Sequence, residues 1–173
     1  MHTFSFSVHT YYQKKAKEIC LMQLTEQENT VIKDLQTQEK TCVEKYRFYE
    51  KSANDMRLKE LFHRIGDEEQ EHFDSLGQVL RGEVPNVASA KVGMEGYRPE
   101  VSYSAGDNSE EKRHDQFLCT DCIATEKLVS STYNDDLFRF NATNVRKLLN
   151  HIQTEEQNHA EMIYKYKTTN GMA

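Results

Sequence analysis

Two short acidic motifs ending in histidine stand far apart in the chain. Residues 68–72 read Glu-Glu-Gln-Glu-His, and residues 155–159 read Glu-Glu-Gln-Asn-His. Residues three positions apart lie on one face of a helix, so each motif can direct a carboxylate and an imidazole to one point: Glu69 with His72, and Glu156 with His159. Two such pairs brought together would form a metal site.

The two motifs belong to an internal repeat with a period of 87 residues. The same shift lays Glu39 on Glu126 and Tyr46 on Tyr133. Chance rarely aligns so many identities, which also include Asp34, Lys40, Asn54, Leu61 and Ile65 with their equivalents 87 positions later. We therefore expect the two halves of the chain to share one structure.

The spacing within each half predicts one site. Glu39 and Glu69 each lie fifteen residues from Asn54, so two antiparallel helices joined there would climb roughly 22 Å to the same height. The second half repeats this spacing around Asn141. Two hairpins packed face to face would bring together four carboxylates and two imidazoles, the ligand set of two iron or manganese ions in a helical bundle. The predicted ligands are Glu39, Glu69, His72, Glu126, Glu156 and His159.

Four further residues are expected beside these ligands. Tyr46 and Tyr133 lie two turns beyond Glu39 and Glu126, where a phenol could hydrogen-bond a ligand carboxylate or simply fill the core. Glu68 and Glu155 could each accept a hydrogen bond from the ligand histidine of the opposite hairpin and so fix its tautomer, or could face solvent. Three further histidines have no histidine at the equivalent position of the repeat and are expected at the surface: His63, His114 and His151.

Helix signals divide the chain. A capping box at residues 25–28 and apolar residues at three- and four-residue steps predict a first helix to about Ala53, and the other helices follow by the same periodicity. We expect an N-terminal arm of residues 1–24 and one bundle of residues 25–170, with helix hairpins 25–81 and 109–168 joined by a linker, 82–108. The third helix is expected to run to Phe140.

The linker holds both prolines and most of the glycines. Its length is unusual within a compact domain, but a four-helix bundle needs a long crossover when its third helix runs parallel to its second. The alternating residues 101–104 could add a short strand or lie along the surface. These features predict an all-α, antiparallel four-helix bundle.

Composition narrows the class of protein. The 173 residues include 29% charged residues and carry a net charge of −6 with no basic face, so we expect no nucleic-acid partner. No apolar run is long enough to span a membrane and no secretory signal stands at the start, so we expect a cytoplasmic protein that is not secreted and has no membrane partner. The four cysteines are expected as reduced thiols, with Cys42 and Cys122 facing the bundle interior: Cys20, Cys42, Cys119 and Cys122.

At these residues the chain resembles the ferritin-like superfamily, over roughly residues 24–166. Glu39 with Tyr46 is similar to the helix 1 signature of rubrerythrins. Residues 121–127 (Asp-Cys-Ile-Ala-Thr-Glu-Lys), 133–134, 149–153 and 155–159 resemble the coat F (spore coat) branch more closely, which implies a spore-forming bacterium. Rubrerythrins carry another glutamate three residues after the helix 3 ligand; here that residue is Val129, and the rubredoxin tail is also absent. The resemblance therefore does not imply the complete peroxidase chemistry of rubrerythrins.

Two functions remain open from the sequence. The first is a di-iron or di-manganese protein of coat F type that reacts with oxygen or peroxide, an oxidoreductase of the peroxidase, catalase or oxidase type. The second is a structural spore coat component with a vestigial metal site. The expected partners are metal ions together with a homodimer or a spore coat assembly, and the spore coat is the expected location besides the cytoplasm.

Overall fold

The computed structural model describes residues 23–87 and 96–173. Over these residues the chain is all-helical, without a β-strand, which confirms the predicted all-α class. The arm of residues 1–24, with Cys20, lies almost entirely outside the described residues, and residues 101–104 form no strand. None of the described helices is both long and apolar enough to cross a membrane. The elements are α2 (Glu26–Ser52), α3 (Met56–Leu80), α4 (Glu110–Asp136), the short 3-10 helix η1 (Leu137–Arg139) and α5 (Thr143–Thr169).

Three of the four long helices of the described residues, α2, α3 and α4, begin at polar caps. Thr25 accepts a hydrogen bond from the Glu28 amide, and the Glu28 carboxylate accepts one from the Thr25 amide, so the predicted capping box is present. Asp55 caps α3 and Ser109 caps α4 in the same manner, each with a side-chain oxygen that accepts from an amide in the first turn. The predicted third helix is wrong at its end, because α4 stops at Asp136 and the chain tightens into η1 before Phe140.

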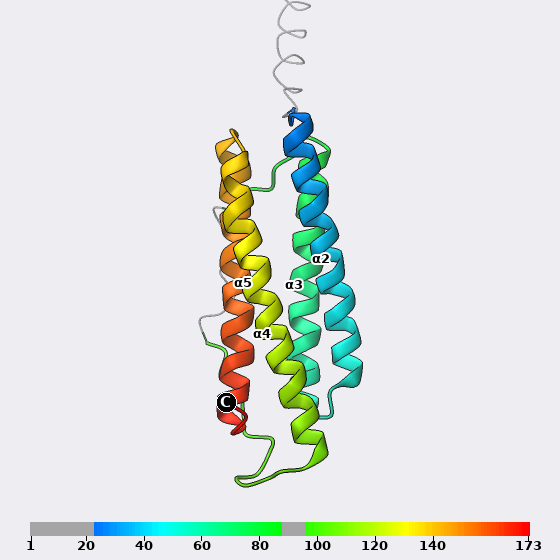
Figure 1. Cartoon of the computed structure of the whole chain (residues 1–173), viewed down its shortest axis with the longest axis vertical. Coiled ribbons are helices and arrows are strands. Elements are labelled where there is room, and N and C mark those ends of the chain that lie inside the picture. Colours follow the sequence, from blue (N-terminus) through cyan, green and yellow to red (C-terminus); the bar gives the residue numbers. More distant parts are fainter. Residues whose placement is uncertain (1–22, 88–95) are drawn as a thin grey trace, which may run out of the picture.

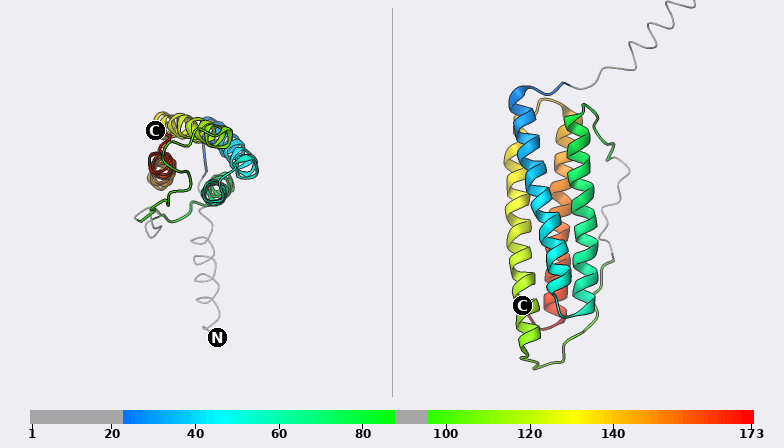
Figure 2. Two further views of the ribbon diagram at one scale, coloured as in Figure 1. Left: turned by 90° about the horizontal axis from the view of Figure 1, so that it is seen from below. Right: turned by 90° about the vertical axis from the view of Figure 1, so that its right-hand side faces the viewer.

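The four long helices pack as two antiparallel hairpins, α2 with α3 and α4 with α5 (Figure 1). Helices α3 and α4 run in the same direction, and the described parts of the linker leave α3 at one end of the bundle and reach α4 at the other (Figure 2). Hydrogen bonds tie the hairpins at both ends, from the Asn141 amide to Glu28 at 3.1 Å and from the Asn54 amide to Asp115 at 2.8 Å. The chain thus crosses the full length of the bundle between its two halves.

The second part of the linker is held by buried polar groups. Asn170 accepts hydrogen bonds from the Ser102 and Tyr103 amides at 2.7 and 3.0 Å. The Tyr103 hydroxyl donates to Asp115 at 2.7 Å, and Asp115 also accepts from the Asp55 amide. The Asp115 carboxylate at the start of α4 therefore binds both the end of the linker and the turn between α2 and α3.

The apolar core has two parts with a polar layer between them. One cluster, with Leu35, Leu76 and Leu148, fills the end of the bundle where α3 finishes, and the other, with Phe62 and Met162, fills the opposite end. Gly66, a misfit in the helical pattern, lies where a β-carbon would come 3.2 Å from the Tyr46 β-carbon. Glycine at this position lets α3 approach Tyr46 of α2 closely, and a side chain there would require a shift of a few tenths of an ångström.

Candidate metal centre

The six side chains predicted as ligands meet in the middle layer of the bundle. All are buried, with relative exposures of 0–3%. They form two groups in which the donor atoms lie within 4.8 Å of one another: Glu39, Glu69, His72 and Glu156; and Glu69, Glu126, Glu156 and His159. Glu69 and Glu156 belong to both groups. The six side chains therefore form two overlapping donor groups, each of which could hold a metal ion.

The two histidines are oriented from outside the centre. The His72 Nε2 lies 2.9 Å from Glu155, and the His159 Nε2 lies 2.9 Å from Glu68. Each contact joins one hairpin to the other, as the repeat had suggested. When the imidazole is neutral, a carboxylate that accepts the Nε2 proton leaves the lone pair on Nδ1, the nitrogen that faces the acidic cluster.

The two tyrosines also connect the hairpins. The Tyr46 hydroxyl donates to Glu126, and the Tyr133 hydroxyl donates to Glu39. Both rings are also fully buried in the core. Each tyrosine therefore has both of the roles that the sequence left open, since it hydrogen-bonds a carboxylate and fills the core. Glu39 and Glu126 each belong to only one of the two donor groups, and each is oriented by one of the phenols.

Many polar atoms of the cluster have no hydrogen-bond partner. Five are carboxylate oxygens, on Glu39, Glu69, Glu126 and (both oxygens) Glu156, and another is the His72 Nδ1. That nitrogen is 3.1 Å from a Glu156 oxygen but makes no hydrogen bond of acceptable geometry. Orphaned atoms of this kind are costly in a protein interior. Two divalent cations would offset the four carboxylate charges and use these atoms as ligands, so the donor set fits a pair of first-row transition ions.

The close packing of buried carboxylates and imidazoles shifts the pKa values of these groups. Burial raises the pKa of Glu39 to about 7, and burial with the nearby Glu69 and Glu126 raises the pKa of Glu156 well above its usual range. Burial alone would lower the pKa values of His72 and His159, but hydrogen bonds to the surrounding carboxylates raise both. Burial opposes the ionisation of Glu69, yet contacts with the two histidines hold its pKa below 4.5.

These shifts predict a stability that depends on pH in the metal-free protein. Glu39, Glu156 and both histidines bind protons more tightly when folded, so their contributions are present at low pH and are lost as pH rises through the folded pKa values. For Glu39 the change from 4.5 to about 7 corresponds to about 3 kcal/mol. Metal-free protein should therefore lose stability between pH 5 and 8 in urea titrations, and metal-loaded protein should lose much less. A metal-free stability that rises over this window would contradict the prediction.

One histidine expected at the surface is instead partly buried. His63 and His114 are exposed, but the His151 Nε2 lies 3.2 Å from Glu155, the carboxylate that contacts His72. The equivalent position in the other half is Arg64, which contacts Glu68 at 3.1 Å. The available sequence signal was the four-residue spacing of His151 and Glu155, which Arg64 and Glu68 repeat in the first half.

The thiols described by the structure are buried and unpaired: Cys42, Cys119 and Cys122. Burial raises the pKa values of Cys42 and Cys122, and nearby carboxylates of the acidic cluster raise them further. The predicted inward position of Cys42 and Cys122 is thus correct, and both are poor nucleophiles.

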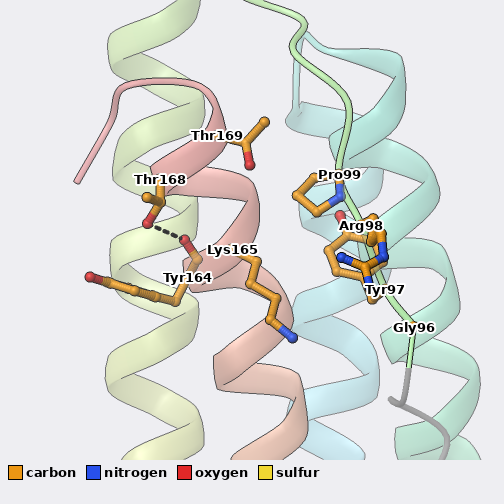
Figure 3. Close-up of a pocket in the computed structure, with 8 residues that line it drawn as sticks. All are labelled: Gly96, Tyr97, Arg98, Pro99, Tyr164, Lys165, Thr168 and Thr169. Carbon is orange, nitrogen blue, oxygen red and sulfur yellow. Dashed lines mark hydrogen bonds between the residues drawn. The ribbon is translucent and has the colours of Figure 1, made fainter.

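A surface pocket of about 460 Å³ lies away from the acidic cluster, between the linker and α5 (Figure 3). Arg98 and Lys165 contribute positive charge to its lining, and the Thr168 hydroxyl is occupied by a hydrogen bond to the Tyr164 carbonyl. None of the six clustered residues reaches this pocket. It has the wrong charge for a cation site.

Comparison with protein families places a match in the second half of the chain. Residues 114–173 match the family model of the Coat F domain. This segment includes most of α4 and all of α5, and with them Glu126, Glu156 and His159. No curated protein and no solved structure matches the chain. The family match therefore covers the second half of the internal repeat, and the first half supplies the other three clustered residues.

Proposed function

We propose that the chain is a ferritin-like di-metal carboxylate protein of coat F type that binds two iron or manganese ions. The observation that carries this proposal is the pair of overlapping donor groups that share Glu69 and Glu156 and leave buried atoms without partners. Glu39 and Glu126 would each serve one ion, and His72 and His159 would complete the two positions through Nδ1. The arrangement matches the ligand pattern of di-iron and di-manganese helical bundles.

We further propose that the centre reacts with oxygen or hydrogen peroxide. Bound iron or manganese would supply Lewis acidity and electrons. The protein's part is to exclude water with the apolar clusters on both sides and to orient the carboxylates with Tyr46 and Tyr133. No residue of the chain is assigned a role in catalysis beyond binding and positioning.

Reconstituted protein should consume hydrogen peroxide or oxygen, and Glu126→Gln should lower the rate by at least about tenfold. The substitution keeps the size of the side chain and an acceptor for Tyr46 but removes a ligand charge. Glu60→Gln, on the solvent side of α3, serves as the matched control and should retain full activity. Equal turnover in wild type and Glu126→Gln would point to stray metal and would overturn the redox proposal.

The second candidate is a structural component of the spore coat with a vestigial site. The Coat F match favours it, and so do several large apolar side chains that are 56–79% exposed, among them Phe48, Phe117, Leu128 and Phe138. On this proposal the bundle serves assembly, as a homodimer or within the coat. Light scattering that shows larger assemblies in the absence of metal, together with no metal-dependent turnover, would favour this candidate over the first.

A further inference from the structure

A cavity of about 330 Å³ lies at the outer seam between α3 and α5 and reaches the candidate metal centre. Its inner wall includes His72, whose side chain belongs to one of the two donor groups. The pocket of Figure 3, between the linker and α5, contains no member of the acidic cluster. The centre is therefore approached from the seam where its two histidines are hydrogen-bonded to outer carboxylates.

A second cavity adjoins the first on its outer side. It has a volume of about 620 Å³ and shares with the inner cavity the linker residues 85–87 and the side chain of His151. Exposed Lys147 lies in this outer part. Together the two cavities form a path from the bundle surface to His72, with His151 at the junction.

The lining of the inner cavity suits a cation. Glu68, Glu71 and Glu155 supply three carboxylates, His72 and His151 supply two imidazoles, and no lysine or arginine lines it. An ion with six water molecules needs about 180 Å³, at about 30 Å³ for each water, which is less than the volume available. Carboxylates in a cleft raise the local concentration of cations and their rate of entry, and the exposed Glu71 is the carboxylate of this lining that contacts none of the described imidazoles.

We propose that divalent metal ions enter the centre through this cavity, with Glu71, Glu155 and His151 as temporary ligands, and pass His72 to reach the buried carboxylates. The second observation besides charge is the place of His72, which lines the cavity, contacts the cavity residue Glu155 through Nε2 and faces the buried carboxylates with Nδ1. The proposal rests on the proposed function, because it assumes that the centre holds metal. It adds the route and the groups that an ion meets first.

The test is the rate of metal uptake. Metal-free protein is mixed with iron(II) without oxygen, or with manganese(II), and the uptake is followed by competition with a chromogenic chelator. Ser75→Phe, which places a ring in the cavity, should slow uptake by at least about tenfold and leave the final amount of bound metal unchanged. Ser75→Ala is the matched control and should load at the wild-type rate.

A charge variant tests the same route without altering packing. Glu71→Lys reverses an exposed charge at the cavity and should slow uptake by about three- to tenfold at low ionic strength, with the difference shrinking in high salt. Glu44→Lys makes the same change in net charge at an exposed position of α2 that lines neither the inner nor the outer cavity, and should have little effect. If Ser75→Phe does not fold, the comparison of Glu71→Lys with Glu44→Lys still tests the entry route.

The possible outcomes separate the two proposals. Wild-type rates in both Ser75→Phe and Glu71→Lys, with full final loading, would overturn the entry route and leave the metal centre intact. A wild-type protein that takes up no metal at equilibrium would overturn the proposed function itself and the entry route with it. Slow uptake in both variants with full final loading would support the route.

Discussion

Metal-loaded protein is expected to contain two ions per chain and to melt about 5 to 10 °C above metal-free protein at neutral pH. A ligand that binds only the folded state adds about 2.7 kcal/mol at a hundredfold excess over its dissociation constant, which corresponds to a shift of this size for a domain of this length. The physical reason is the set of buried carboxylate oxygens without partners, which the ions would occupy. Calorimetry before and after chelation measures the shift.

Glu39→Gln provides the control for this prediction. It removes one buried charge but keeps an acceptor for the Tyr133 hydroxyl. Metal-free Glu39→Gln should be at least as stable as metal-free wild type at pH 8, because one repelling charge is gone, and it should gain less from metal. If metal leaves the wild-type melting temperature unchanged and Glu39→Gln loses stability with and without metal, Glu39 is an ordinary structural residue.

The shared carboxylates should have a larger effect on metal content than the unshared ones. Glu69 and Glu156 belong to both donor groups, whereas Glu39 and Glu126 each belong to one. We therefore expect Glu69→Gln and Glu156→Gln to reduce bound metal from two ions to nearly none, and Glu39→Gln and Glu126→Gln to leave about one ion per chain.

Elemental analysis after gel filtration distinguishes these cases, with circular dichroism to show that each variant is folded. The comparison is internal, because all four variants make the same chemical change at equally buried positions. The same metal content in all four variants would contradict the two-position geometry even if metal is bound.

Sequence spacing predicted much of this arrangement for a simple physical reason. A helix has a fixed rise per residue, so equal distances of Glu39 and Glu69 from the Asn54 turn place them at one height in any antiparallel hairpin. The capping box of Thr25 and Glu28 was likewise readable, because both of its hydrogen bonds are local. The assignment of the six residues as metal ligands remains a prediction.

Other features depend on how the hairpins dock and could not be read from spacing. Tyr46 bonds the carboxylate of α4, not that of its own hairpin, because the rotation of each helix is set by packing across the bundle. The role of Asp115 arises because the turn amides of Asn54 and Asp55 and the Tyr103 hydroxyl meet it at one end of the bundle. The cavity at His72 depends on the course of the linker, whose composition gave no sign of which seam it covers.

The crossed pattern of contacts at the centre has a consequence for the order of folding. Each hairpin is formed from helices adjacent in sequence, whereas the bonds from Tyr46, Tyr133, His72 and His159 to their carboxylate partners all join one hairpin to the other. Local contacts form faster than contacts that close long loops. The two hairpins should therefore form first, and the buried acids become neighbours only when the hairpins meet. Metal would then act after the docking transition state and slow unfolding more than it speeds folding.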